Sequence, residues 1–411
     1  MASSIVSAAD SNDENRKPVR HGMKRVQFRQ DTQADAEPET CPHGGRVYDT
    51  VGQDFSRLDA LDEVLAADVL DAWYPPAPSV LEQLSNNLAW CARTSPPVHA
   101  DGLRDVIAKS RGIESSQIVL GCGSSDLIFR VVPKFLGGTG SIVIPQPSYA
   151  EYRHVLTNVH DREVAPFFTD GEDFVLQVDA LTEFANSVDA SAICLVNPCN
   201  PTGFALKREQ MVQLLDGIGN KQIVVDETYI DYIGKENSLE QLVEHYPNLL
   251  ILKSVSKFYA LSGMRIGYAV TSAKRAKRFQ LETPPYIVST PGQMAAIAAF
   301  ESESYYIERV EETHRLRDSL SARLNALPGL RVMPSNINCI LLDLNDTGWT
   351  AADFWSEMQA RKLLCRDIGH QGLTDATRYV RLAVLNEDDN EKMVTMISAV
   401  ISTPSAQYRP E

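Results

Sequence analysis

Short apolar runs alternate with longer amphipathic stretches over residues 80–300, and this alternation restricts the fold more than any other feature. Helical patterns lie between several of the runs, for instance at residues 124–135 and 207–215. The apolar runs have the length of strands and fall at residues 118–120, 141–144, 192–196, 223–226, 249–253 and 265–270. Strands that alternate with helices predict an α/β domain, in which helices cover a mainly parallel sheet.

The rest of the chain indicates further regions. Residues 1–45 are polar, mixed in charge and poor in aromatic side chains, as is typical of a disordered or loosely docked tail. A long helical stretch from Pro291 to residue 327 precedes a mixture of short strands and helices, which predicts a smaller α+β domain. The predicted regions are therefore an N-terminal arm at 46–80 that forms part of the small domain, a large domain at 81–300 and a small domain at 301–411.

Charge and hydropathy narrow the possible partners and the compartment. The chain has a net charge of −15 and no long run of Lys and Arg, which argues against nucleic acid or an anionic membrane as a partner. Apolar runs long enough to cross a membrane are missing, as is the apolar core of a signal peptide. The seven cysteines fit no zinc or redox spacing, so we expect reduced thiols in a cytoplasmic protein.

The strongest chemical signal is the segment 254–257 (Ser-Val-Ser-Lys), which comes directly after an apolar run. Burial and neighbouring cations lower the pKa of such a lysine, so that Lys257 offers a free amine as nucleophile. Arg265 follows eight residues later between Gly263 and Gly267, and its forked cation suits a phosphate. The alternative interpretation, a surface lysine after a strand, does not account for the glycines and the arginine together.

Three other segments place polar groups where ligands bind in α/β sheets, at strand ends and helix starts. Residues 197–203 (Asn-Pro-Cys-Asn-Pro-Thr-Gly) follow one apolar run, and Asp226 ends the next. The turn 121–126 (Gly-Cys-Gly-Ser-Ser-Asp) precedes an apolar helix, and backbone N–H groups at a helix start attract anions. Each segment alone could be an ordinary turn or cap.

Taken together, these segments resemble the fold-type I enzymes that depend on pyridoxal 5′-phosphate (PLP), in the class I and II aminotransferase family. Within that family they resemble histidinol-phosphate aminotransferase and threonine-phosphate decarboxylase. The resemblance covers roughly residues 70–400 and implies a large domain with a mainly parallel seven-stranded sheet, plus a smaller α+β domain. It also implies a homodimer whose active sites are completed across the interface.

The resemblance assigns roles to residues of these motifs. Lys257 would form a Schiff base with PLP, Asp226 would pair with the pyridine nitrogen, and Asn200 and Tyr229 would hydrogen-bond the phenolic oxygen. Tyr149, in the segment 147–152, would stack on the cofactor ring. Phosphate contacts would come from one group of residues: Gly123, Ser124, Ser125, Ser254, Arg265 and Tyr74, the last of these reaching the PLP of the partner subunit.

The substrate end of the pattern carries arginines. In the segment 378–384, Arg381 matches the family arginine that binds the substrate α-carboxylate, and Arg378 is the competing candidate. Arg366 resembles an arginine that phosphate-bearing members place against the distal phosphate of the substrate, although a solvated surface position fits it equally well. No metal site is indicated.

The resemblance therefore predicts an aminotransferase for an amino acid or amine with a second anionic group. Two departures affect the substrate pocket: the segment 70–75 lacks the family's asparagines, and Arg93 begins a segment where a Tyr-Pro-Asp type of turn is usual. They leave open a decarboxylase of a phospho- or phosphono-amino acid, or a lyase or cyclase of specialised metabolism. The cofactor motif cannot separate these reactions, because the orientation of the substrate decides which Cα bond breaks.

Overall fold

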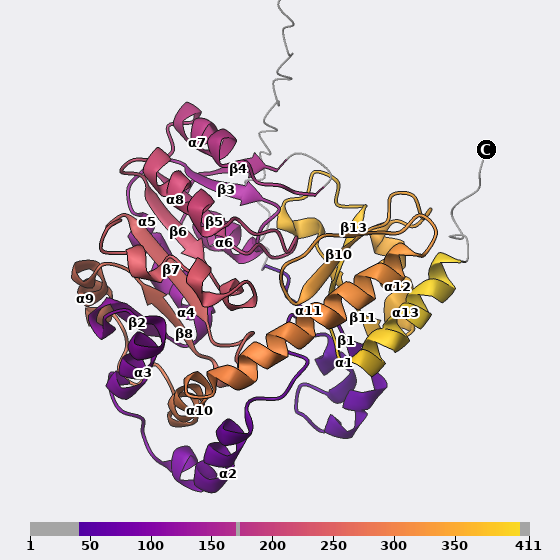
Figure 1. Cartoon of the computed structure of the whole chain (residues 1–411), viewed down its shortest axis with the longest axis horizontal. Coiled ribbons are helices and arrows are strands. Elements are labelled where there is room, and N and C mark those ends of the chain that lie inside the picture. The colour runs from indigo at the N-terminus through magenta and orange to yellow at the C-terminus, as the bar shows by residue number, and fades with distance from the viewer. Residues whose placement is uncertain (1–40, 170–172, 403–411) are drawn as a thin grey trace, which may run out of the picture. The chain divides into compact units, whose positions relative to one another are not determined.

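The computed structural model describes residues 41–169 and 173–402, and these described residues belong to one compact unit (Figure 1). Most of the predicted tail, residues 1–40, lies outside the described residues. The described part contains a seven-stranded sheet and a four-stranded sheet, together with a pair of two-residue strands. The predicted boundaries near residues 80 and 300 stay predictions.

The seven-stranded sheet has the order β2-β8-β7-β6-β5-β3-β4. Strand β8 runs antiparallel to the other six strands, which are parallel to one another, so the sheet is mainly parallel, as predicted. Its strands are β2 (Ile118–Gly121), β3 (Ile142–Gln146), β4 (Val164–Phe168), β5 (Ala192–Val196), β6 (Gln222–Asp226), β7 (Leu249–Ser254) and β8 (Gly267–Val270).

Helices cover both faces of this sheet, and each face packs its own apolar cluster. The central strands are buried along their whole length, so they read as continuous apolar runs. On one face lie α4 (Gly123–Arg130), α5 (Val132–Leu136), α6 (Ala150–His154) and α9 (Ala273–Leu281). On the other lie α3 (Asp101–Arg111), α7 (Val178–Ser187), α8 (Arg208–Gly217) and α10 (Thr290–Phe300), with α2 (Pro78–Arg93) packed on α10.

The long helix α11 (Glu303–Asn325) runs from the end of α10 to the four-stranded sheet (Figure 1). This sheet has the order β12-β13-β10-β9 and is antiparallel throughout. Its strands are β9 (Arg331–Met333), β10 (Cys339–Asp343), β12 (Arg366–Asp367) and β13 (Tyr379–Ala383). The remaining elements are α1 (Val47–Val51), β1 (Leu65–Ala66), α12 (Ala351–Ala360), β11 (Leu363–Leu364) and α13 (Glu387–Ile401).

The predicted helices differ from the structure at two points, and the first difference has a local cause. The stretch 124–135 is divided into α4 and α5 just before Pro133, because proline has no N–H to continue the helical ladder. The stretch from Pro291 to 327 is likewise two helices, α10 and α11, joined at residues 301–302. Strand β4 is not in the prediction, since it lies at the sheet edge and its side chains are only half-buried.

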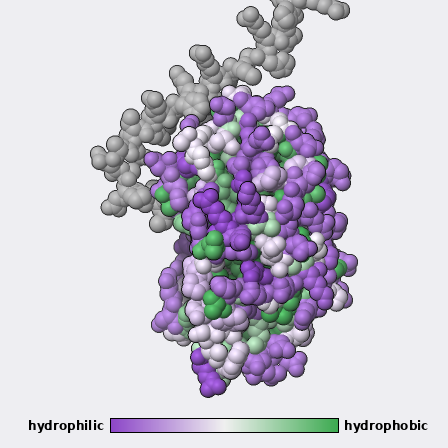
Figure 2. All heavy atoms as spheres, turned by 90° about the vertical axis from the view of Figure 1, so that its left-hand side faces the viewer, coloured by the Kyte–Doolittle hydropathy of each residue, from purple (hydrophilic) through white to green (hydrophobic). Residues whose placement is uncertain are grey.

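The surface of the protein is mainly polar. The face shown in Figure 2 is largely hydrophilic, with small hydrophobic patches between the polar side chains. In the part of the chain that the structure describes, no helix is long and apolar enough to cross a membrane. All seven cysteines lie in that part and are free thiols, as expected.

Candidate active site

A cavity of about 260 Å³ opens at the C-terminal ends of the parallel strands, the edge where ligands bind in α/β sheets. It brings together most of the residues that the motifs predict, although they are spread over more than 250 positions of the chain. Its lining from these motifs comprises Ser124, Ser125, Tyr149, Asn200, Asp226, Tyr229, Ser254, Lys257, Arg265, Arg366 and Arg381. The strand ends therefore converge on one site.

One end of the cavity is a polar cup formed by the start of α4 and by the segment after β7. Gly123 has φ +78°, and a Cβ there would lie 2.5 Å from an Arg265 guanidinium nitrogen. Gly267 is equally constrained, because its Cβ would lie 2.5 Å from the Ser124 backbone nitrogen. The two glycines thus let α4 approach β8 closely, and the start of the helix offers N–H groups beside a guanidinium. This cup suits a phosphate.

Asp226 ends β6 and is buried at the floor of the cavity. Burial raises the pKa of its carboxyl, while hydrogen bonds from Thr228 and Tyr152 oppose that rise. The Tyr152 hydroxyl donates to Oδ2 at 2.6 Å and the Thr228 backbone N–H donates to Oδ1 at 2.9 Å. Tyr152 was not predicted as a site residue; its position on the helix that follows Tyr149 was the only available signal.

Three further side chains form the walls beside Asp226. The Tyr149 ring meets the Tyr152 ring edge-on, with centroids 6.2 Å apart, and burial raises the pKa of Tyr149. Burial also raises the pKa of Tyr229, although Arg381 opposes this. Asn200 accepts a hydrogen bond through Oδ1 from Arg381 Nη1 at 2.6 Å, so its amide group is held in one orientation. Both phenols are thus neutral hydrogen-bond donors.

Lys257 follows β7 after two residues, and its ammonium contacts a carboxylate that sequence reasoning did not identify. Nζ donates to Asp71 Oδ1 at 2.9 Å, and the Ser262 hydroxyl donates to the same oxygen at 2.6 Å. Burial raises the pKa of Asp71, but the attraction to Lys257 and the hydrogen bonds from Lys257 and Ser262 together outweigh this and lower the pKa overall. The ion pair with Asp71 therefore holds Lys257 at the mouth of the polar cup. Asp71 would release the lysine when Lys257 Nζ binds another group instead.

The two predicted substrate arginines lie opposite each other on neighbouring antiparallel strands, Arg366 on β12 and Arg381 on β13. Arg381 is buried; Nη2 donates to the Asp68 carbonyl at 2.7 Å, and Nε has no partner among the described residues. Arg366 donates to the Pro42 carbonyl and lies 3.2 Å from His370 Nε2. Like charges directly opposite on a sheet repel, so this end of the cavity favours an anion.

The competing arginine has a different role. Arg378 donates through two nitrogens to the carboxylate of Asp343 on β10, which holds the four-stranded sheet together. Strand alternation explains the difference, because Arg378, which directly precedes β13, and Arg381, three residues later, face opposite sides of the sheet. The structure therefore brings Arg381 into the cavity and leaves Arg378 in an ion pair.

Residues 41–46 lie along the substrate end of the cavity, and the sequence had placed most of them in the tail. His43 and Gly44 line the cavity. The backbone N–H groups of Gly45 and Arg46 donate to Asp68 Oδ2 at 2.7 and 3.1 Å. His43 Nε2 lies 2.9 Å from a carboxylate oxygen of Glu151. No periodic pattern signals these contacts, because a strap without regular structure has none.

Tyr74 requires a correction. It was expected to reach the PLP phosphate of the partner subunit, but its ring is buried within its own chain and its hydroxyl donates to the Phe258 carbonyl at 2.7 Å. The ring packs beside Trp73 and Tyr306, with centroids 5.4 and 6.5 Å away. An aromatic residue next to a proline-rich turn has no local pattern that distinguishes a core position from a ligand contact, and here core packing prevails.

The residues present fit PLP. The cup of N–H groups, hydroxyls and Arg265 suits its phosphate, and the buried Asp226 carboxyl suits its ring nitrogen. Tyr149, Tyr229 and Asn200 offer a ring face and hydrogen-bonding groups, while Lys257 offers an amine. The unpartnered Nε of Arg381 adds a donor for a carboxylate. Each chemical part of the cofactor therefore has a matching group in the cavity.

Comparisons with known proteins point in the same direction. The sequence profile of the family described as aminotransferase class I and II matches residues 73–397. Histidinol-phosphate aminotransferase 2 of Archaeoglobus fulgidus is 29% identical over 328 residues, which cover 80% of this chain and 90% of that protein. Histidinol-phosphate aminotransferase of Methanothermobacter thermautotrophicus is 29% identical over 331 residues, which cover 80% and 87%.

Solved structures share the fold. Histidinol-phosphate aminotransferase from Sinorhizobium meliloti, in complex with PLP, has a TM-score of 0.77 at 20% identity and covers 88% of this chain and 96% of its own. L-threonine-O-3-phosphate decarboxylase from Porphyromonas gingivalis has a TM-score of 0.70 at 24% identity, with 81% and 98% covered. At these identities the similarity shows the fold alone. An aminotransferase and a decarboxylase, which catalyse different reactions, share this fold.

Proposed function

This chain belongs to the aminotransferase class I and II family, and we propose that it transfers the amino group of an amino acid or amine that carries a second anionic, phosphate-like group. Its cofactor is PLP, as in the family. The relatives named above act on histidinol phosphate, an amine whose one anionic group is a phosphate. We also propose that the cofactor residues have the roles that the family resemblance assigns to them, with the exception of Tyr74.

The opposed pair of Arg366 and Arg381 is the observation that supports a second anionic group. The two residues are direct partners in the register of β12 and β13, and both line the cavity. An anion between them would relieve their repulsion and form charge-assisted hydrogen bonds, which are worth about 1.5–3 kcal/mol each. In a substrate with two anionic groups, Arg381 binds one, and Arg366 is free for the other once it leaves the Pro42 carbonyl. The single phosphate of histidinol phosphate would lie between the two arginines.

The chain's own residues then have distinct tasks. PLP, when bound, supplies a carbonyl that captures the amine and a ring that accepts electrons. Asp226 holds a proton on the ring nitrogen, and the start of α4 with Arg265 anchors the phosphate. Arg381 fixes the substrate so that one bond of its Cα atom is perpendicular to the plane of the cofactor ring. Lys257 Nζ, once released, accepts the Cα proton as general base.

A spectroscopic assay of the bound cofactor tests the proposal. We expect L-histidinol phosphate to convert the visible band of the lysine-bound cofactor to the near-ultraviolet band of its amine form, and a 2-oxo acid to restore the visible band. Histidinol without the phosphate is the matched control and should react far more slowly. Release of CO2 from O-phosphothreonine with the visible band retained would instead identify a decarboxylase and overturn the proposal.

The proposal includes a homodimer in the cytoplasm. Leu81, Leu88 and Trp90 on α2 expose large apolar surfaces, which a second copy of the chain would bury. Light scattering of the purified protein should give twice the monomer mass, and charged substitutions at Leu88 and Trp90 should give the monomer. A wild-type protein that is monomeric at micromolar concentration would contradict the dimer.

A further inference from the structure

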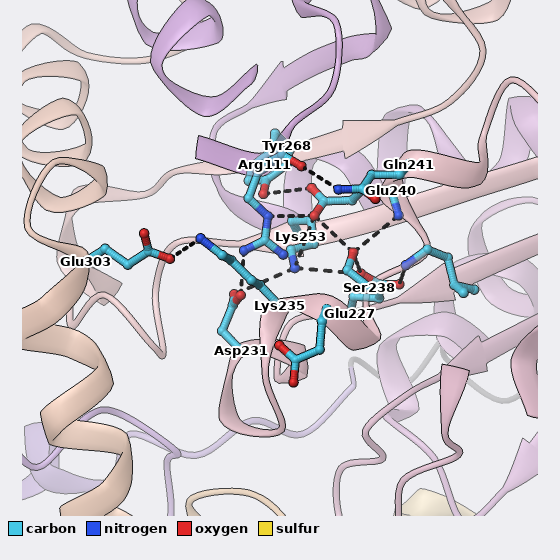
Figure 3. A network of polar contacts seen from close by, with 12 residues as sticks. Arg111, Glu227, Asp231, Lys235, Ser238, Glu240, Gln241, Lys253, Tyr268 and Glu303 are labelled. Carbon is cyan, nitrogen blue, oxygen red and sulfur yellow. Dashed lines mark hydrogen bonds and ion pairs between the residues drawn. The ribbon is translucent and has the colours of Figure 1, made fainter. Parts of the chain in front are cut away.

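A cluster of buried charges (Figure 3) lies at the same strand ends as the candidate active site, and none of its side chains lines the cavity. We refer to five ionisable residues as the rear cluster: Arg111, Glu227, Asp231, Glu240 and Lys253. Each of these side chains is at most 7% exposed. Ions are costly to bury, so a cluster of this size requires a reason beyond the folding of an apolar core.

Lys253 lies at the centre of the rear cluster. Its Nζ is 3.6 Å from an Asp231 oxygen, 3.7 Å from a Glu227 oxygen and 3.8 Å from a Glu240 oxygen. Arg111 donates to Glu240 and Asp231, at 2.6 Å each. Three carboxylates therefore face two cations, and Lys253 alone contacts all three. Without Lys253 the carboxylates would repel one another, with Arg111 as their only cation in the cluster.

The rear cluster is joined to the active site through the backbone. Side chains alternate along a strand, so Glu227 points away from the cavity directly after Asp226, and Lys253 does so directly before Ser254. Asp231 lies two residues after Tyr229. Glu227 and Asp231 therefore hold both ends of the short loop that carries Tyr229 and follows Asp226, while Lys253 fixes the strand end that leads to Lys257.

We propose that Lys253 is a positioning residue, which holds the loop 226–231 and the end of β7 in register so that Asp226, Tyr229 and Ser254 meet the cofactor. The inference rests on the proposed function, because PLP is the ligand whose contacts are positioned. Lys253 itself does not touch the cofactor; it acts through its backbone neighbours. Its loss should therefore change the affinity for PLP and the spectrum of the bound cofactor, in addition to the thermal stability.

Titration of the protein, freed of cofactor, with PLP tests this proposal. We expect Lys253→Met to raise the PLP dissociation constant about tenfold or more and to shift the visible band, because an unbalanced buried charge displaces the loop. The double variant Lys253→Met/Glu227→Gln restores the balance of charge and should lie within about threefold of wild type. Lys253→Arg should do the same. PLP binding that Lys253→Met leaves unchanged would overturn the proposal.

Thr271→Val is the matched control, since it removes a buried hydrogen bond to the Leu249 carbonyl at the other end of β7. It should lower the melting temperature and leave PLP affinity unchanged. An equal loss of affinity in this variant would mean that Lys253 contributes only to general stability. If Lys253→Met does not fold, Tyr268→Phe decides, because it removes only the hydrogen bond to Glu240 at 3.0 Å. It should weaken PLP binding about threefold, and unchanged binding would again overturn the proposal.

The two proposals fail in different ways. If wild-type protein does not bind PLP, the proposed function is wrong and the inference falls with it. If wild-type protein binds PLP and transaminates while Lys253→Met does so equally well, the proposed function stands and only the positioning role is rejected.

Discussion

The two ends of the cavity are built in different ways. At the cofactor end, each polar group stands at the end of a regular element, as Asp226 does on β6 and Ser124 does at the start of α4. At the substrate end, the groups come from a two-residue strand, from β13 and from the irregular strap 41–46. A shared cofactor thus has a rigid site that depends on the sheet, while the substrate meets segments that can vary without disturbing the sheet.

The electrostatics of the two ends differ as well. The cofactor end is balanced: Asp71 faces Lys257, and the buried Asp226 carboxyl is held by hydroxyl and N–H donors. The substrate end has two opposed arginines, and burial together with the nearby Arg366 lowers the pKa of His370 to about 4. This difference suggests that loss of a group that touches the cofactor abolishes the chemistry, whereas loss of a group that touches only the substrate changes which substrates react.

The largest effect is expected for Lys257→Ala, which removes the amine of the cofactor end. The rate of transamination should fall about 10³-fold or more, because both capture of the cofactor and general-base catalysis are lost. Stopped-flow spectra of the bound cofactor measure this directly. Asp71→Asn is the companion variant; it leaves the amine in place and should retain most of the rate. A Lys257→Ala protein with near-normal turnover would refute the role of the lysine.

Arg381→Ala tests the point where the two ends meet, since Arg381 contacts Asn200 as well as the substrate end. We expect kcat/KM to fall about 100-fold for every substrate that has a carboxylate or equivalent anion there, the loss of about 3 kcal/mol of charge-assisted hydrogen bonding. Arg378→Ala is the matched control on the same chain segment, and its effect should be confined to stability. Equal kinetic losses in both variants would contradict the assignment.

Arg366→Ala should separate substrates from one another. For phosphate-bearing amines, kcat/KM should fall about 30-fold, mainly through KM, whereas amines without the phosphate should be unaffected. Steady-state kinetics with histidinol phosphate and histidinol give the comparison in one experiment. A uniform loss for both amines would mean that Arg366 supports the structure of the pocket and does not read the distal anion.

The smallest effect is expected for Tyr152→Phe, which alters the support of the cofactor end. The Tyr152 hydroxyl stabilises the charged form of Asp226, so its removal should raise the pKa of that carboxyl further. The acid limb of the profile of kcat/KM against pH should then move to higher pH, with a loss of about tenfold on that limb and little change at alkaline pH. A shift to lower pH would contradict the role of this hydrogen bond.

The contrast between the two ends also explains what the sequence could predict. Asp226, Lys257 and the turn around Gly123 follow apolar runs whose period and length identify strands and helices, so their position at one sheet edge could be inferred. Six strands of the seven-stranded sheet are confirmed in the same way, whereas the half-buried edge strand β4 is not among the predicted runs. These predictions succeeded because local pattern and tertiary position coincide.

The remaining contacts depend on segments that are distant in the sequence and have no periodic signal. Asp71 lies 186 positions from Lys257, with which it pairs, and Arg366 lies 324 positions from the Pro42 carbonyl that it contacts. Tyr74 has the sequence context of a ligand contact and yet packs in the aromatic core. The rear cluster also escaped notice, because Glu227 and Lys253 lie next to residues with obvious roles.

The central claim is that Lys257 binds the cofactor covalently at the cofactor end of the cavity. Borohydride reduction of the purified protein, followed by mass spectrometry of its peptides, tests this claim most directly. The account predicts one pyridoxyl group per chain, attached to the peptide that contains Lys257 and absent from the Lys257→Ala protein. A pyridoxyl group on another lysine, or none on a protein purified with PLP, would contradict it.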